Sequence, residues 1–189
     1  GVNPSRFKDP LRPVENLSWN QANAFAAKLT EQESAAGRLP ASFVFRLPTQ
    51  LEWEFASRAG TDSPFSWGSS ATPEQGNFRG VYPRDPERSA SFPRSEHTSP
   101  VRSFEPNPLG LFDMHGNVWE FTLDNYNDRY PNEFRLVDWI ETRRSDFIVI
   151  RGGSWQDTPE RARSAARERM GRDDTNASTG LRLVIAPAR

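Results

Sequence analysis

Residues 107–121 read NPLGLFDMHGNVWEF, which is the most distinctive run of the chain. Gly, Asn and Pro, the residue types that turns require, alternate there with acidic and large apolar side chains. The same turn-forming residues are frequent from Gly60 to Phe147, so we expect that region to be mostly loop. A loop of this length inside a folded chain is typically functional, or is held in place by ions and side-chain hydrogen bonds.

Upstream of this region, two segments have the pattern of a capped helix. Each begins with a capping box, in which a hydroxyl residue and the Glu or Gln three positions later satisfy each other's backbone N–H groups. The two boxes are Ser18 with Gln21 and Thr49 with Glu52. Apolar residues then follow at helical spacing. The sequence therefore predicts helices at residues 19–30, with 19–36 as the longer alternative, and at residues 50–59.

Strands are expected where short apolar or alternating runs lie between turn-forming residues. Four segments have this pattern: 43–47, 147–151, 163–167 and 181–185. The run at 147–151 reads FIVIR and ends at two glycines, which is typical of a buried strand. The pattern at 163–167 is the weakest of the four.

The composition excludes several classes of protein. The chain has 189 residues, the size of one domain, and 24 basic against 25 acidic residues, so charge gives no case for nucleic acid or an anionic membrane. No run of about 18 apolar residues is present, so no membrane span is predicted. The absence of Cys excludes disulfides, thiolate metal sites and thiol nucleophiles.

The core is expected to depend on aromatic rings and arginines. Apolar residues make up only 35% of the chain, but it has 13 Phe and 6 Trp, and large rings bury much area each. Lys8 and Lys28 are its only lysines, so nearly all positive charge is carried by arginine. The planar guanidinium stacks on rings and pairs with carboxylates, so we expect many contacts of both kinds.

Five motifs in order resemble the formylglycine-generating enzyme (sulfatase-modifying factor) family. They are residues 13–19 (PVENLSW), 46–54 (RLPTQLEWE), 107–121, 151–155 (RGGSW) and 180–183 (GLRL). The resemblance covers nearly the whole chain and implies an α+β fold with little regular secondary structure, a variant of the C-type lectin fold. It implies one domain over residues 1–189. Family members begin well before the stretch matching residues 3–7, so we expect an N-terminal part of the domain to be missing, supplied by the native chain or by a partner chain.

The resemblance also shows where this chain departs from the active enzymes. Counting forward from the GGS motif, the family's copper-binding cysteine pair falls at Asp157 and Ala162. A copper(I) site needs soft thiolate ligands, which neither residue supplies. We therefore expect no copper, no catalytic residues of that kind and no formylglycine generation by that mechanism.

For calcium the resemblance implies two sites. The first would use Asp113, Gly116, Val118 and Glu120, which offer the carboxylate and carbonyl oxygens that calcium prefers. The alternative is a structural turn in which the two carboxylates only accept bonds from backbone N–H groups. The second site would begin at Asn77 and Phe78, although the acidic residue expected in the following loop is absent.

Ligand contacts are expected between the last two motifs, in the region that lines the groove of the family. The candidates are Gln156, Asp157, Thr158, Arg161, Arg163, Arg167 and Arg169. Such groups suit a polar or anionic ligand. The alternative is a loop whose arginines pair with neighbouring carboxylates. His97 and His115 are the only imidazoles, and His115 is predicted to lie on the surface rather than to bind iron or move protons.

Three functional hypotheses remain open. The first is a non-catalytic module, stabilised by calcium, that binds a protein or a small polar ligand. The second is an oxidoreductase of another branch of the superfamily, of the nonheme-iron or siderophore-maturation type. The third is an inactive paralogue that binds a sulfatase peptide.

Overall fold

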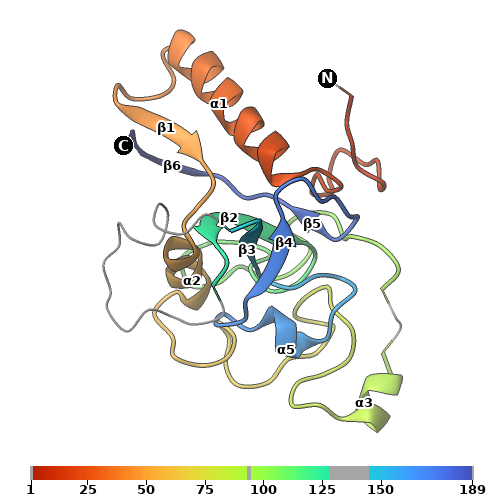
Figure 1. Ribbon diagram of the computed structural model, residues 1–189. Helices are drawn as coiled ribbons and strands as arrows, with labels where there is room; N and C mark the ends of the chain where they lie inside the picture. The colour runs from red at the N-terminus through yellow and green to blue at the C-terminus, as the bar shows by residue number, and fades with distance from the viewer. Residues whose placement is uncertain (1, 93–94, 128–144, 189) are drawn as a thin grey trace.

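The computed structural model describes residues 2–92, 95–127 and 145–188, which form a mixed arrangement of helices and strands (Figure 1). The elements in chain order are α1 (Trp19–Ala35), β1 (Phe43–Arg46), α2 (Gln50–Arg58), α3 (Pro86–Ala90), β2 (Trp119–Asn125), β3 (Phe147–Arg151), α5 (Pro159–Ala162), β4 (Glu168–Gly171), β5 (Thr179–Gly180) and β6 (Val184–Pro187). Long loops join them, as expected from the sequence. α3 lies at the periphery of the molecule, away from the sheets (Figure 1).

Two sheets organise the described residues. The larger has the strand order β4-β3-β2-β5, in which β3 is antiparallel to both of its neighbours and β2 is parallel to β5. The smaller pairs β1 with β6, with Phe45 opposite Ile185. The second sheet therefore joins an early segment of the chain to its last strand, and α1 and β1 lie beside each other above the larger sheet (Figure 1).

The two predicted helices are confirmed, together with their capping boxes. Ser18 Oγ accepts from the N–H of Gln21, and the Gln21 side chain accepts from the N–H of Ser18. The same reciprocal pair joins Thr49 and Glu52 at the start of α2. α1 takes the longer of the two predicted lengths. α2 ends at Arg58, and the φ of 49° at the following Ala59 is in the left-handed region that stops a helix.

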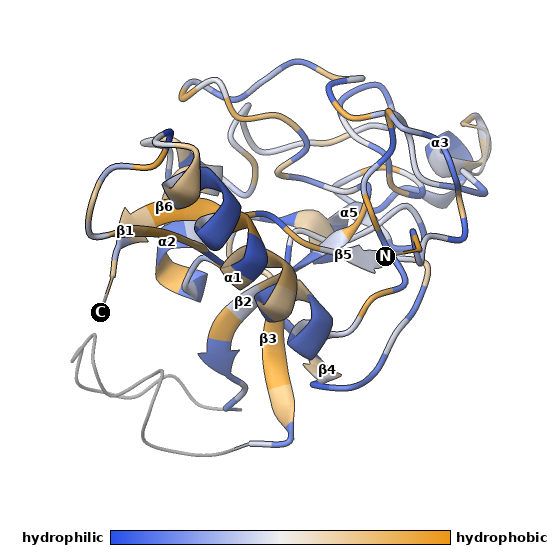
Figure 2. Cartoon of the chain, turned by 90° about the horizontal axis from the view of Figure 1, so that it is seen from above, coloured by the Kyte–Doolittle hydropathy of each residue, from blue (hydrophilic) through white to orange (hydrophobic). Residues whose placement is uncertain are grey.

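The principal core lies between the start of α1 and the larger sheet. Trp19, Leu123, Leu181 and Leu183 pack at its margin. The core itself is formed by eight buried residues: Leu17, Ala22, Leu47, Trp119, Phe121, Ile148, Ile150 and Met170. β3 supplies apolar side chains over most of its length (Figure 2). Phe65, Ala71, Phe78 and Ala162 form a second cluster under the loops. The aromatic core predicted from the composition is therefore present.

The predicted positions of strands and loops need several corrections, and the short strand β5 was not predicted. β2 lies inside the region predicted to be mostly loop, and so does the short helix α3. Residues 163–167 form no strand, because a turn closed by the bond from Ala166 N to Arg163 O follows α5, and β4 begins only at Glu168. Residues 181–183 lie between two strands, because Leu181 and Leu183 pack on the core before β6 starts.

Arginines make the contacts expected of them. The Arg172 guanidinium lies 4.5 Å from the centre of the Trp19 ring, and that of Arg169 lies 4.9 Å from the centre of the Phe147 ring. Arg161 pairs with Glu168 at 2.5 Å. Among the described residues, no helix is long and apolar enough to cross a membrane.

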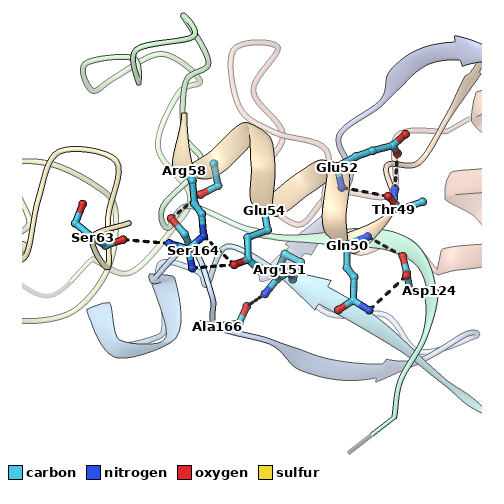
Figure 3. A network of polar contacts seen from close by, with 11 residues as sticks. Thr49, Gln50, Glu52, Glu54, Arg58, Ser63, Asp124, Arg151, Ser164 and Ala166 are labelled. Carbon is cyan, nitrogen blue, oxygen red and sulfur yellow. Dashed lines mark hydrogen bonds and ion pairs between the residues drawn. The ribbon is translucent and has the colours of Figure 1, made fainter. Parts of the chain in front are cut away.

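Beneath α2 lies a network of buried polar contacts (Figure 3). Arg151 of β3 pairs with Glu54 of α2 and donates to the carbonyl of Ala166 at 2.6 Å. The Asp124 carboxylate of β2 accepts from the backbone N–H of Gln50 at 2.7 Å, at the first turn of α2. Burial raises the pKa of Asp124 above its ordinary value. These bonds hold α2 against the larger sheet.

Candidate functional site

The turn from Asp113 to Glu120 leads directly into β2. Asp113, Gly116 and Asn117 all have positive φ, at 57°, 94° and 68°. The N–H of Gly116 donates to Gly152 O at 2.8 Å, and that of Asn117 donates to Asn77 O at 2.9 Å. A Cβ at Gly116 would lie 2.6 Å from Asn77 O, so only glycine fits this approach.

A cavity of about 320 Å³ lies beside this turn. Asp113, Val118, Glu120 and Arg182 contribute to its wall. Asp113 Oδ2 accepts the N–H of Arg102 at 2.8 Å, whereas its Oδ1 is buried without a hydrogen-bond partner. Burial raises the pKa of the Asp113 carboxyl above its ordinary value. A carboxylate oxygen that is buried and unpaired is a suitable ligand for a cation.

Glu120 is more firmly engaged than Asp113. Its carboxylate accepts from the indole N–H of Trp53 at 2.7 Å and binds Arg182 at 2.7 and 2.8 Å. The structure therefore brings Asp113, Val118 and Glu120 to one cavity, but Arg182 already neutralises Glu120. A cation at this turn would therefore bind through the Asp113 side chain and the carbonyl oxygens of the turn rather than through a free Glu120 carboxylate.

Asn77 and Phe78 lie against the same turn. The carbonyl of Asn77 accepts from Asn117, and its side-chain amide donates to His97 O at 3.1 Å. The Phe78 ring is buried in the second cluster of the core. Both residues thus support the turn structurally, and their contacts test neither of the two calcium predictions.

The prediction that His115 lies on the surface is wrong. Its ring is buried, with Nδ1 2.7 Å from Ala162 O and Nε2 accepting the N–H of Ser66 at 3.2 Å. Burial lowers the pKa of His115 to about 4, so the ring is neutral at pH 7 with its hydrogen on Nδ1. His97 instead contacts Phe7. The two imidazoles belong to different clusters and form no shared site.

The two positions that match the family's cysteine pair hold structural contacts. Asp157 Oδ2 accepts from the indole N–H of Trp119 at 2.8 Å and from the hydroxyl of Ser154 at 2.5 Å. Ala162 is fully buried, its Cβ position lies against Gly153, and its carbonyl binds His115. Both positions therefore contribute to packing and hydrogen bonding of the loop that follows β3.

The seven candidate ligand residues have different surroundings and partners. Gln156 and Thr158 are exposed beside Asp157, and Arg161 lies between Asp157 and Glu168. Arg163 donates to the carbonyl of Glu160 at 2.8 Å. The guanidinium groups of Arg167 and Arg169 both lie over the Tyr126 ring. Arg161 thus makes ion pairs of the kind that the alternative expects, and among these seven residues Thr158 lines a cavity of about 630 Å³.

The cavity that Thr158 lines was not predicted from the sequence. It measures about 630 Å³ and lies between residues 79–92 and the start of α5. Arg79 and Arg84 are among the residues that line it. The two segments are 66 residues apart or more, and neither carries a motif, so no local signal predicted that they would meet.

The fold and the turn together define a class of protein. Both are the fold and the turn of a C-type-lectin-like domain of the formylglycine-generating type, as the resemblance implied. The chain belongs to the FGE-sulfatase family, because the family model described as the sulfatase-modifying factor enzyme 1-like domain matches residues 1–187.

Named relatives agree with this assignment. The inactive C-alpha-formylglycine-generating enzyme 2 of Bos taurus is 33% identical over 175 residues, which cover 89% of this chain and 48% of the relative. The formylglycine-generating enzyme of Streptomyces coelicolor is 34% identical over 181 residues, covering 93% and 53%. The chain thus spans about half the length of the curated relatives it matches. The solved structure of Treponema denticola variable protein 1 superposes with a TM-score of 0.77 at 26% identity, covering 97% of this chain and 77% of that one.

Proposed function

We propose that this chain is a binding module of the family that does not generate formylglycine. The observation that carries the proposal is the chemistry at Asp157 and Ala162, the positions of the cysteine pair. Neither side chain can act as a thiolate. The Asp157 carboxylate is engaged by Trp119 and Ser154, and the Ala162 methyl group is fully buried. The scaffold is therefore retained while the soft copper ligands are absent.

Calcium bound at the Asp113–Glu120 turn is the second element of the proposal. The unpaired Asp113 Oδ1, the three positive φ angles and the adjoining cavity support it. Calcium would cross-link the loops at this turn and would have no part in a reaction. Among the described residues, no group of three or more His, Cys, Asp or Glu side chains could hold a metal, so this site would depend largely on backbone oxygens.

A second candidate function is an inactive paralogue that binds a sulfatase peptide. It is favoured by the similarity to the Bos taurus protein, whose name describes it as inactive. This candidate differs from the first only in its ligand. The nonheme-iron form of the oxidoreductase hypothesis has less support, because His97 and His115 lie in separate clusters.

The test is a conversion assay with a cysteine-containing sulfatase peptide and copper, followed by mass spectrometry. The formylglycine-generating enzyme of Streptomyces coelicolor is the positive control. We expect that enzyme to convert the peptide and this chain to leave its mass unchanged, whereas formylglycine produced by this chain would overturn the proposal. Fluorescence anisotropy with the labelled peptide then separates the two candidates, because saturable binding without conversion supports the paralogue.

A further inference from the structure

The cavity of about 630 Å³ between residues 79–92 and the start of α5 has the size of a small-molecule site. Its wall combines two cationic side chains, Arg79 and Arg84, with one anionic side chain, Glu160. Val81, Phe92 and Pro86 supply apolar surface. Two positive charges against one negative charge leave a net charge of +1 around a partly apolar space.

Backbone contacts hold the walls of this cavity in place. Arg79 N donates to Asp157 O at 2.7 Å, which fixes the loop against the segment that carries Thr158 and Glu160. Gly80 has a φ of 81°, and a Cβ there would lie 2.8 Å from the Ser89 hydroxyl. That hydroxyl accepts the N–H of Val81 at 3.3 Å. The cavity is therefore built by tertiary contacts rather than left between loose loops.

Arg79 has no carboxylate partner within the described part of the chain. Its guanidinium lies 5.9 Å from the centre of the Trp155 ring, and its Nε is buried without an acceptor. Other arginines in the fold, such as Arg46 and Arg182, have carboxylate partners at 2.7 Å. Across residues 2–92, 95–127 and 145–188, no such ion pair is found for Arg79 or Arg84. The two guanidinium groups therefore lack a counter-charge within the described residues, and an anionic ligand in the cavity would supply one.

We propose that this cavity binds a small monocarboxylate with an apolar body. The carboxylate would pair with Arg79 and Arg84, close to the Thr158 hydroxyl, and the apolar body would lie against Val81 and Phe92. The single net positive charge matches a monoanion, and Glu160 disfavours polyanions such as nucleotides by like-charge repulsion. Arginine forks suit planar carboxylates in particular.

This inference rests on the proposed binding role and names its ligand class. The conversion assay measures catalysis, whereas the titration below measures binding at a different place, so the two can fail independently. The site is also distinct from the cavity beside Asp113, with which it shares no lining residue.

The experiment is a calorimetric titration with N-acetyl-leucine and N-acetyl-leucinamide, which differ only in the carboxylate. We expect saturable binding of the acid and at least tenfold weaker binding of the amide. Arg79→Gln should weaken binding of the acid at least tenfold. Arg88→Gln makes the same change at an exposed position of α3 outside the cavity wall, and it should leave the affinity for the acid unchanged. Equal affinity for acid and amide, equal effects of the two variants, or no saturable binding would overturn the proposal.

A second variant keeps the test valid if Arg79→Gln does not fold. Ala90 lies at the end of α3 and lines the cavity with an exposed side chain, so Ala90→Trp fills the space without disturbing the core. We expect Ala90→Trp to unfold at the same denaturant concentration as the parent protein and to lose binding of N-acetyl-leucine. Undiminished binding by a folded Ala90→Trp variant would place the ligand elsewhere and overturn the proposal.

Discussion

Arg151, which is fully buried, and Glu54, which is partly buried, form an ion pair between two motifs that lie almost 100 residues apart (Figure 3). The Arg151 side chain is fully buried, lies over the Trp53 ring and also donates to Ala166 O. Glu54 is shared with Arg58, which binds its other oxygen at 2.8 Å. The pair thus attaches α2 to β3 and joins the Glu of the second motif to the Arg of the fourth in one structural contact.

Replacing Glu54 should therefore be strongly destabilising. Glu54→Gln removes the carboxylate paired with the fully buried Arg151 cation, and removing one partner of a buried charge costs about 3–5 kcal/mol. Urea unfolding followed by circular dichroism measures the loss. The control is Glu31→Gln on the exposed side of α1, which should change the free energy of unfolding by less than about 0.5 kcal/mol. Similar effects of the two variants would contradict the assigned role of the pair.

The close approach at Gly116 gives a second prediction. Gly116→Ala places a Cβ 2.6 Å from a backbone oxygen at a residue with positive φ, so it combines a clash with backbone strain. We expect a loss of more than about 3 kcal/mol or a failure to fold. Gly110→Ala has a similar positive φ but open space around the new Cβ, so it should cost about 1 kcal/mol. Equal costs would argue against the tight turn.

The third prediction concerns the pH dependence of the stability that the Glu52 carboxylate contributes. Hydrogen bonds from Arg46, at 2.7 Å each, lower the pKa of Glu52 from 4.5 to about 2 despite its partial burial. Between pH 4.5 and pH 2 the unfolded chain binds more protons at Glu52 than the folded chain does. The stabilisation is therefore complete above pH 4.5 and is lost as the pH falls toward 2. The carboxylate is 42% exposed, so screening reduces the contribution to about 1 kcal/mol.

Glu52→Gln tests this directly, because Gln preserves the capping box and removes only the charge. We expect the parent protein to be more stable than the variant at pH 6 and the difference to disappear on acidification to about pH 2. Thermal unfolding at a series of pH values measures it. A stability difference that does not depend on pH would show that the ion pair with Arg46 contributes nothing.

The sequence predicted the features that depend on local contacts. Both helices were predictable because each capping box is formed by residues three positions apart. β2 was missed because residues Trp119 to Thr122 are consecutively buried, and a strand buried on both faces has no alternating pattern. The family resemblance predicted the turn that precedes β2 but not the pairing of Glu120 with Arg182.

The sequence mainly failed to predict which polar side chains are buried. His115 was assigned to the surface because it lies in the turn of the third motif, at a position that the resembled family varies. Its partners, Ser66 and Ala162, are 49 and 47 residues away, so no local pattern reports them. The cavity beside Arg79 was missed for the same reason, since its other wall begins with Thr158.

The buried position of His115 leads to a fourth prediction. His115→Ala removes the partner of two buried backbone groups, Ser66 N–H and Ala162 C=O, and opens a cavity beside Phe65. We expect a loss of about 3 kcal/mol in the free energy of unfolding at pH 7. His97→Ala, in the more exposed imidazole, should cost less than about 1 kcal/mol. A smaller effect at position 115 than at 97 would refute the structural role.

Calcium binding at the Asp113 turn gives the fifth prediction. A ligand that binds only the folded state stabilises it by about 2.7 kcal/mol at a concentration 100 times its Kd, so calcium should raise the unfolding temperature and a chelator should reverse the shift. Asn tolerates the positive φ of Asp113, so Asp113→Asn removes the charge while preserving the backbone. The shift should therefore disappear in Asp113→Asn and persist in Asp62→Asn, an exposed control. An equal calcium shift in both variants, or none in the parent protein, would remove calcium from the proposed function and leave the Asp113–Glu120 turn as a structural one.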